Sequence, residues 1–219
     1  VDITEYTKLR RAEFEKACEK SAPGRFIASV PALVGEAGIH ADDIIVVTDV
    51  GQHQMWTAAF YPVCHPRQFL TSGSLGTMGF GLPVAIGAAY ANPGKRIICF
   101  SGDGSIMMNI QELATLAELQ LDVTVIVLDN GVLGMVRQQQ HFLFNDNFSA
   151  SIFERSPDLS AIAKSFGIIS VDTSVADWHK VAFVPPGEGP RFVVCKIDEN
   201  EMVYPFVPGS TANIDAIES

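Results

Sequence analysis

The sequence is short of charge and of cysteine. Only 18% of its residues are charged, and its four cysteines show no CxxC spacing. Cys99 and Cys195 lie inside apolar runs that predict buried strands, whereas Cys18 and Cys64 lie elsewhere in the chain. This scatter gives no support for a disulfide framework, so we expect free thiols and a reducing, cytoplasmic location.

The chain also lacks a signal peptide, an internal repeat, a P-loop lysine motif and a serine-nucleophile elbow. Its longest apolar stretch, Ser74–Ala91, contains four glycines and a proline, and it predicts a packed helix rather than a membrane span. A net charge of −10 excludes a general nucleic-acid-binding role, which requires a concentrated basic surface. We therefore expect neither a membrane nor a nucleic acid among the partners.

What the chain does have is a length of 219 residues and a hydrophobic content of 47%, which is enough for one substantial core. Residues 1–22 are rich in acidic and basic side chains and predict a helical lead-in or linker. Residues 23–219 are expected to form a single domain. The first residue is Val1 rather than Met, which suggests a fragment of a longer protein.

The stretch Ile97–Met135 organises the rest of the chain. Its β-branched run Ile97–Phe100 predicts a buried parallel strand. Ser105–Leu119 has apolar residues at helical spacing, and Val123–Leu128 predicts a second buried strand. Strand, helix and strand with short connections predict a right-handed parallel crossover. Further strands are expected over Ile44–Thr48, Ile168–Val171 and Arg191–Ile197. The predicted fold class is therefore α/β, with an open, mainly parallel sheet and helices on both faces.

Asp103 and Asn130 follow the two central predicted strands. Adjacent parallel strands end at the same edge of a sheet and lie about 4.8 Å apart. A carboxylate and a carboxamide oxygen placed side by side suit a small, hard cation such as Mg²⁺. Gly104 and Ser105 stand where a helix begins, so the free N–H groups and the helix dipole attract an anion. Together they predict a diphosphate and Mg²⁺ site at the carboxyl edge, where open α/β sheets bind ligands.

The sequence GDGS at Gly102–Ser105, followed by Asp129-Asn130, resembles the GDG…N motif of thiamine diphosphate (ThDP) enzymes. Three further blocks resemble the C-terminal, diphosphate-binding domain of the catalytic large subunit of acetolactate synthase (acetohydroxyacid synthase). These blocks are Val50–Trp56 (VGQHQMW), Thr71–Gly87 (TSGSLGTMGFGLPVAIG) and Leu133–Gln140 (LGMVRQQQ). The resemblance runs with gaps from about Asp43 to the C-terminus.

The resemblance implies which residues would hold ThDP. The Gly76 carbonyl would accept a hydrogen bond from the aminopyrimidine, and Met78 would keep the cofactor bent. Taken alone, Met78 predicts only core filling. His53 would bond a phosphate oxygen, whereas a lone histidine in a turn more often bonds to backbone. The full set of implied cofactor contacts is Gly51, Gln52, His53, Gly76, Met78, Gly102, Asp103, Gly104, Ser105, Asn130, Val132, Leu133, Gly134 and Met135.

The implied metal ligands are the side chains of Asp103 and Asn130 and the backbone carbonyl of Val132. Many family members have asparagine where this chain has Asp129, a small departure that we do not expect to abolish binding. At Gln139 many members instead place a tryptophan that selects the larger acceptor ketoacid. Glutamine, like the VYPFVPG tail, resembles the isozyme-I type of large subunit and implies a weak preference for 2-oxobutyrate over pyruvate. The alternative interpretation of Gln139 is a solvated polar helix face.

The remaining segments give local expectations. Residues 57–70 predict an irregular connection between elements. Phe142–Arg155 is aromatic and turn-rich, and it is a candidate lid that would exclude water. Glu199–Ser219 predicts a tail that folds back over the site. Further helices are expected over Arg25–Ala37, from Leu82-Pro83, from Arg137 and over Pro157–Phe166.

The resemblance implies one part of an enzyme that condenses pyruvate to 2-acetolactate for branched-chain amino-acid biosynthesis. In that family a glutamate on an N-terminal domain of the neighbouring subunit activates the ThDP, and a middle domain holds FAD. No stretch of this chain resembles either domain, so we expect no catalytic residue here and no activity from the isolated chain. A homodimer of the parent subunit is implied, with contacts near Ser74–Tyr90, and a small regulatory subunit is left open as a further partner.

Two alternatives stand beside this hypothesis. The first is another ThDP-dependent 2-oxoacid decarboxylase or carboligase. The second is a non-catalytic phosphate-binding α/β module. Replacing Asp103 distinguishes the second alternative, because only a metal-bound diphosphate depends on that carboxylate.

Overall fold

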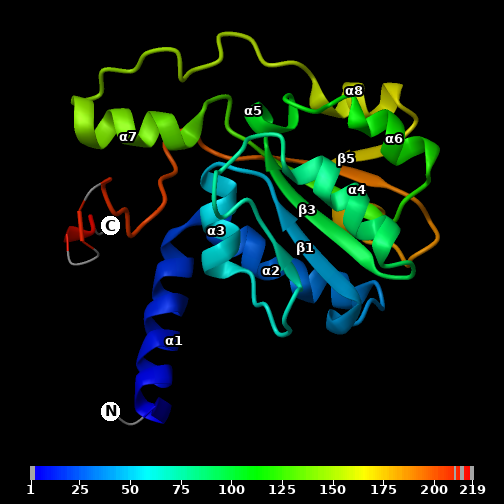
Figure 1. The fold of residues 1–219 in the computed structure, drawn as a ribbon, viewed down its shortest axis with the longest axis horizontal. Coiled ribbons are helices and arrows are strands. Elements are labelled where there is room, and N and C mark those ends of the chain that lie inside the picture. The colour runs from blue at the N-terminus through cyan, green and yellow to red at the C-terminus, as the bar shows by residue number, and fades with distance from the viewer. Residues whose placement is uncertain (1–2, 210, 213–214, 218–219) are drawn as a thin grey trace.

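A six-stranded sheet forms the centre of the structure, which is a computed structural model (Figure 1). It describes residues 3–209, 211–212 and 215–217, with residues 3–11 described by their backbone alone. The strands are β1 (Ile44–Thr48), β2 (Phe69–Leu70), β3 (Arg96–Gly102), β4 (Val123–Asp129), β5 (Ile169–Asp172) and β6 (Arg191–Lys196). Their order is β2-β1-β3-β4-β6-β5, and all five pairings are parallel. The predicted open, parallel α/β sheet is confirmed.

The two central strands explain why the sheet has a core on each side. Both β3 and β4 are buried along their whole length. Because side chains of a strand alternate between faces, Ile97 and Cys99 enter one hydrophobic core while Ile98 and Phe100 enter the other. A strand buried on both faces must be apolar at nearly every position, which is the pattern that the sequence shows.

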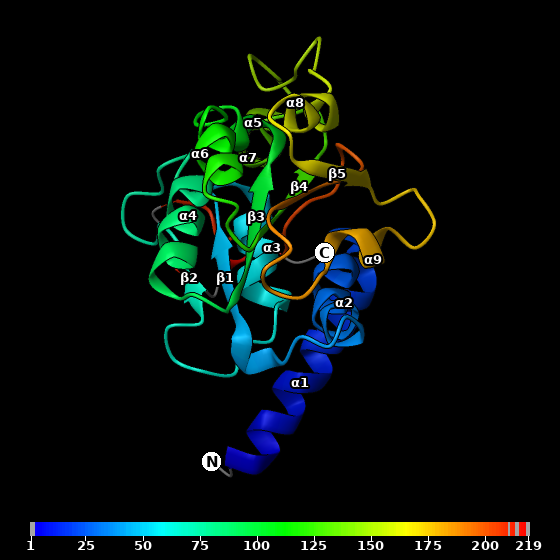
Figure 2. The same ribbon diagram turned by 90° about the vertical axis from the view of Figure 1, so that its right-hand side faces the viewer.

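Helices cover both faces. One core receives α4 (Gly81–Ala91), α6 (Glu112–Glu118) and α8 (Leu159–Ser165), and the other receives α2 (Ala22–Glu36), α3 (Gln52–Phe60) and α9 (Trp178–Ala182). Figure 2 shows α4 and α6 on one side of the sheet and α2 and α9 on the other. The remaining helical segments are η1 (Ala41–Asp43), α5 (Asp103–Ile106) and α7 (Gly134–Phe144).

The first helix, α1 (Ile3–Lys20), projects away from the sheet in both views (Figures 1 and 2). Its C-terminal half contacts the body, where the rings of Phe14 and Phe60 lie 5.5 Å apart. The helix expected in this segment is therefore observed, while the domain boundary at residue 22 stays a prediction. Within the residues that the structure describes, no helix combines the length and the apolar character needed to cross a membrane.

The predicted continuous helix over Ser105–Leu119 is wrong. The structure instead forms α5, ends it at Ile106, and begins α6 at Glu112. In the intervening turn the Asn109 side chain donates a hydrogen bond to the Gly79 carbonyl at 2.7 Å. This bond ties the turn to the glycine-rich segment before α4, and the apolar residues on either side still face the same core.

The prediction of an irregular connection over residues 57–70 is also wrong in part. Thr57 to Phe60 complete α3, which ends just before Pro62, because a residue that precedes proline disfavours helical geometry. Phe69 and Leu70 form β2, which pairs with β1 at the edge of the sheet. The segment expected as a lid begins inside a helix, since α7 continues to Phe144. The sequence analysis did not predict η1 or α9.

A buried arginine fixes one connection at the amino edge of the sheet. Arg96 begins β3 and is fully buried. Its guanidinium donates hydrogen bonds to the carbonyls of Val184 at 2.8 Å, Pro185 at 3.0 Å and Gly189 at 3.1 Å, and it pairs with Asp122 at 3.5 Å. The loop between α9 and β6 is therefore held to the sheet by a charge that is almost completely hydrogen-bonded.

We predict that Arg96→Met lowers the free energy of unfolding by about 3 kcal/mol, because several buried carbonyls lose a charged donor. Urea unfolding at constant m-value measures this loss. The neighbouring Lys95→Met is the matched control and should stay within about 0.5 kcal/mol of the parent chain, as most surface substitutions do. Equal stability of the two variants would show that Arg96 does not hold the loop.

Candidate functional site

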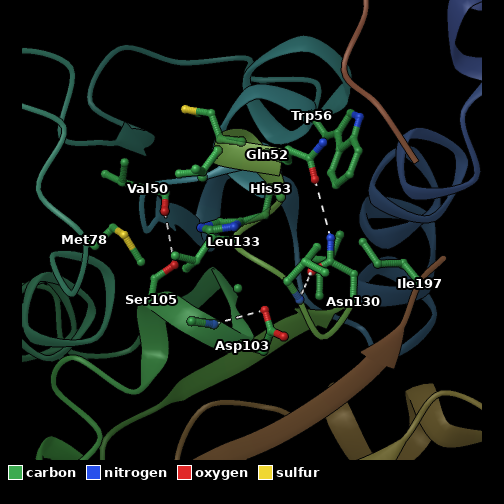
Figure 3. A pocket seen from close by; sticks show the side chains of 18 of the residues that line it. Val50, Gln52, His53, Trp56, Met78, Asp103, Ser105, Asn130, Leu133 and Ile197 are labelled. Carbon is green, nitrogen blue, oxygen red and sulfur yellow. Dashed lines mark hydrogen bonds between the residues drawn. The ribbon is translucent and has the colours of Figure 1, made fainter. Parts of the chain in front are cut away.

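Three adjacent strands end together and build a cavity at the carboxyl edge of the sheet. Thr48 of β1 is level with Phe100 of β3, and Gly102 of β3 is level with Leu128 of β4. The residues that follow these strands therefore meet at one edge, where a cavity of about 240 Å³ opens. Figure 3 shows the side chains around it.

All fourteen residues expected to contact a cofactor line this one cavity. The structure thus brings together segments that lie as far apart in sequence as Gly51 and Met135. Sequence reasoning missed five further lining residues, all of them apolar. They are Val50, Trp56, Leu128, Val136 and Ile197. Trp56 follows Gln52 and His53 by one helical turn on α3, so its position on the same helix face was the available signal.

Asp103 is a buried carboxylate with no cation beside it. It accepts hydrogen bonds from the Gly104 N–H at 3.0 Å and from the Gly131 N–H at 2.8 Å. Burial and the nearby charge of Asp129 raise the pKa of Asp103 to about 7. Among the described residues no Lys, Arg or His side chain pairs with it. A divalent cation would supply the missing positive charge.

Asn130 and Val132 lie on the loop that Asp103 holds. The Asn130 Nδ2 group donates to Gln52 Oε1 at 3.4 Å, while Asn130 Oδ1 accepts from the Val132 N–H at 3.3 Å. The Val132 carbonyl accepts none of the backbone hydrogen bonds between described residues outside the regular elements. The loop therefore offers a carboxamide oxygen and a backbone carbonyl, both suited to a hard cation.

These ligands do not form a self-sufficient metal site. In the parts of the chain that the structure describes, no three side chains of the His, Cys, Asp and Glu types gather into a metal-binding group. The expected set contains a single carboxylate, so Mg²⁺ would need oxygens from water and from a phosphorylated ligand to complete its octahedron. The donor set thus fits a cation that arrives together with a diphosphate.

Asp129 is buried and forms an ion pair with Lys196 of β6. The Lys196 side chain itself is largely exposed. Lys196 thus gives a counter-charge to the carboxylate beside Asp103 and Asn130, while the charge of Asp129 still raises the pKa of Asp103.

Asp49 is a site-building residue that sequence reasoning missed. It is fully buried and accepts hydrogen bonds from the N–H groups of Val50 at 2.8 Å, Gly79 at 2.8 Å and Gly81 at 3.1 Å. Burial raises its pKa. Its carboxylate therefore ties the glycine-rich segment that carries Gly76 to the end of β1. The signal was an aspartate directly after a buried strand, the same position that Asp103 occupies after β3.

His53 is buried in the first turn of α3, and its Nε2 atom has no hydrogen-bond partner. Burial lowers the pKa of His53 to about 3, so the ring is neutral at physiological pH. A Cβ atom added at Gly102 would lie 2.9 Å from its Nδ1 atom, so glycine at that position gives the ring its space. An unpartnered ring nitrogen at the cavity wall fits hydrogen bonding to a ligand oxygen.

Gly76 and Met78 line the cavity as well. Gly76 has a φ angle of +66°, a left-handed conformation that strongly favours glycine. Met78 reaches toward Gly104, since a Cβ added there would lie 3.7 Å from Met78 Cε. An apolar side chain thus faces the GDGS loop across the cavity.

Gln139, the expected substrate residue, is exposed on α7 and does not line the cavity. Val136 lies three residues earlier, lines the cavity and is 42% exposed. Residues three apart share a helix face, so Gln139 stands one turn beyond the cavity wall. Its role in acceptor preference stays a prediction.

Comparison with known protein families matches residues 49–195 to the family described as thiamine pyrophosphate enzyme, C-terminal TPP binding domain. Over 207 residues the chain is 45% identical to the acetolactate synthase isozyme 1 large subunit of Escherichia coli (strain K12), covering 92% of the chain and 35% of that protein. It is 43% identical over 178 residues to the isozyme 2 large subunit of the same organism, covering 80% and 32%.

A third relative is the acetolactate synthase large subunit of Lactococcus lactis subsp. lactis (strain IL1403), which is 42% identical over 180 residues and covers 80% of the chain and 30% of that protein. The chain thus spans about one third of the length of the curated relatives it matches. The matched range begins at Asp49 and includes every residue placed at the cavity except Ile197.

We predict that His53 makes the stability of the chain fall on acidification. An unfolded histidine has a pKa of about 6.5, whereas the folded value is about 3, so the unfolded state takes up a proton first. Stability is complete above the unfolded pKa, and about 2 kcal/mol is lost by about pH 5. Urea unfolding of the parent chain and of His53→Gln, at about pH 7.5 and about pH 5, should give pH slopes that differ by nearly one proton. Parallel slopes would contradict a buried neutral ring.

Proposed function

Because the chain belongs to the thiamine pyrophosphate enzymes, as a C-terminal TPP-binding domain homologous to acetolactate synthase large subunits, we propose that it is the cofactor-binding part of an enzyme that condenses pyruvate into 2-acetolactate. One observation carries the proposal. A buried carboxylate without a counter-charge, a carboxamide, an available backbone carbonyl and an unpartnered imidazole surround a single cavity. This is the chemistry that a Mg²⁺-bound diphosphate requires.

Three groups would hold Mg²⁺: the Asp103 carboxylate, the Asn130 carboxamide oxygen and the Val132 carbonyl. A cation there favours the ionised form of Asp103, which burial otherwise disfavours. His53 would donate a hydrogen bond to a diphosphate oxygen from its buried position. The remaining charge of the diphosphate would be shared between the cation and these neutral donors.

When bound, ThDP supplies the nucleophilic carbon that adds to a 2-oxoacid and accepts the electrons released by decarboxylation. The residues of this chain would orient it and keep water away. Met78 and Leu133 face the cavity with apolar side chains, and Trp56 lines the same space. Apolar side chains that exclude water from the reacting carbon suppress unwanted proton transfer.

The cavity is a half-site. Its volume of about 240 Å³ lies below the range of about 300–1,000 Å³ that usually encloses a small ligand. His53 is too strongly held in the neutral form to act as a general base near neutral pH. The family resemblance implies that an activating glutamate on an N-terminal domain of a second subunit would complete the site, and that a middle domain of the parent subunit would hold FAD.

The homodimer of the parent subunit would use the surface near Ser74–Tyr90. Leu75 and Tyr90 are 86% and 75% exposed there, and such exposed apolar side chains are candidate contacts for a second subunit. Gln139, one turn beyond the cavity wall on α7, would face the acceptor ketoacid and give a weak preference for 2-oxobutyrate.

We predict that Asp103→Ala abolishes the Mg²⁺-dependent part of ThDP binding, with affinity in Mg²⁺ falling by about 100-fold, the upper end of what disturbing a metal ligand costs. Calorimetric titration of ThDP into the chain, with Mg²⁺ and with a chelator, measures the ThDP affinity with and without the metal. Asp172→Ala is the matched control, because Asp172 ends the edge strand β5 away from the cavity. Identical behaviour of the two variants would favour a phosphate-binding module without a metal.

We predict that the chain alone forms no product from pyruvate and that adding the N-terminal and middle domains of a relative restores 2-acetolactate formation. The domains preceding the matched region of the Escherichia coli isozyme 1 large subunit are the suitable complement. Colorimetric assay of acetolactate, with acetaldehyde measured in parallel, gives the result. Acetaldehyde as the main product would support a decarboxylase instead, and Asp103→Ala in the same mixture is the negative control.

A further inference from the structure

Three carboxamide side chains form a hydrogen-bonded chain that leads from the cavity to the C-terminal segment. Asn130 Nδ2 donates to Gln52 Oε1 at 3.4 Å, a bond drawn in Figure 3. Gln52 Nε2 donates to Gln138 Oε1 at 2.8 Å. Gln138 Nε2 then donates to the Val203 carbonyl at 2.9 Å. The three residues come from the loop after β4, from α3 and from α7.

In this row of hydrogen-bonded amides, the orientation of each carboxamide is set by the group to which it is bonded next. The Val203 backbone both accepts from Gln138 Nε2 and donates its N–H to Gln138 Oε1 at 2.9 Å, so only one orientation of Gln138 satisfies both groups. With Oε1 of Gln138 in place, Gln52 must present its Nε2 group, which also donates to the Glu201 carbonyl at 3.0 Å. Gln52 Oε1 is thereby turned toward Asn130.

Burial makes these orientations expensive to reverse. Gln52 is 5% exposed and Gln138 is 3% exposed, so water has little access to replace a lost bond. A reversed Gln52 amide would place two N–H groups against each other at Asn130 and two oxygens against each other at Gln138. Unpaired polar groups in a low-dielectric interior are destabilising, because they have lost their bonds to water without gaining others.

We propose that Gln138 is a positioning residue that acts through Gln52 to hold the Asn130 carboxamide with its nitrogen toward Gln52 and its oxygen available to the cation. This inference rests on the proposed function, because it concerns the cation assigned to Asn130. Without the relay, only the Val132 N–H, which donates to Asn130 Oδ1 at 3.3 Å, opposes a turn of the Asn130 amino group toward the cation, and that amino group would repel the cation. The backbone groups of Glu201 and Val203 fix the orientation of Gln52 and Gln138, and through Gln52 that of Asn130.

The C-terminal segment is well placed to fix these orientations. Arg137 on α7 donates to the Glu199 carbonyl at 3.0 Å and to Asn200 Oδ1 at 3.0 Å. Further along, the ring of Phe206 stacks on Phe142 of α7 with centroids 5.2 Å apart. α7 begins at the cavity wall with Gly134. The same helix therefore contacts both the C-terminal segment and the loop that carries Asn130.

The test compares the Mg²⁺ enhancement of ThDP binding in two variants of the chain. Gln138→Met removes the amide from the relay, and Gln140→Met is the matched control on the same helix. The Gln140 amide donates to the Ser149 carbonyl at 2.9 Å and accepts from Ser151 Oγ at 2.6 Å, outside the relay. The chain has two tryptophans, so a Trp178→Phe background leaves Trp56 of the cavity wall as the fluorescent reporter.

We expect the ratio of ThDP affinities with and without Mg²⁺ to fall about tenfold in Gln138→Met, the lower end of the effect of losing support for a metal ligand. The affinity without Mg²⁺ and the ratio in Gln140→Met should stay at the parent values. An unchanged ratio, or an equal loss with and without Mg²⁺, would overturn the relay and leave Gln138 a packing role. No Mg²⁺ enhancement in the parent chain would instead overturn the proposed function itself.

A second variant keeps the test decisive if Gln138→Met does not fold, which thermal unfolding reveals. Val203→Pro deletes the backbone N–H that fixes Gln138 Oε1 and changes no side chain that lines the cavity. We expect the same selective fall in the Mg²⁺ ratio, because Gln138 loses its fixed direction. A Val203→Pro chain that folds and keeps the parent ratio would overturn the proposal.

Discussion

The parallel pairing of β1, β3 and β4 is the constraint on which the rest of the structure depends. It places three chain turns at one edge, so residues near positions 49, 103 and 130 meet although long helices separate them in sequence. Each turn carries a polar residue that a buried strand end delivers into the cavity. The Asp49 carboxylate then binds the N–H groups of Gly79 and Gly81, which adds the glycine-rich wall to the same edge. A slip of either pairing by one residue would reverse which face each side chain reaches.

Among the described residues, buried side-chain nitrogens without a hydrogen-bond partner occur at the cavity, in His53 and Trp56, and outside it, at Nε of Arg96 and Arg137. Arg96 is fully buried, yet its terminal nitrogens meet three carbonyls. Asp103 and His53 are buried as well, but in the part of the chain that the structure describes no cationic side chain pairs with Asp103 and no group hydrogen-bonds His53 Nε2. Burying these groups without partners destabilises the ligand-free fold. Proteins normally pair their buried polar groups, so a bound ligand would supply the missing partners and offset this cost. The cavity is thus the place where stability was given up for binding.

The sequence predicted the parts of this structure that are governed by local pattern. Strands β1, β3 and β4 contain apolar runs rich in β-branched residues, whereas the fourteen lining residues were implied by the family resemblance of the motifs at and near the ends of these strands. The break between α5 and α6 was missed because apolar periodicity continues through it, while the cause is a long-range bond from Asn109 to Gly79. β2 has only two residues and no pattern to detect. Asp49 and the Gln52–Gln138 pair were missed because their roles appear only when distant segments meet.

The charge of the site explains why the proposed diphosphate ligand would need a cation to bind there. The chain carries a net charge of −10, and the cavity adds the carboxylate of Asp103 to the approach of an anionic diphosphate. A helix terminus offers little here, since α5 has four residues and the Gly104 N–H already donates to Asp103. Neutral donors such as His53 orient an anion, but they do not cancel its charge. In the proposed site, a divalent ion shared between Asp103, the Asn130 loop and the phosphate oxygens would turn this repulsion into attraction, and the direction of the Asn130 carboxamide would set how strongly that ion holds the cofactor.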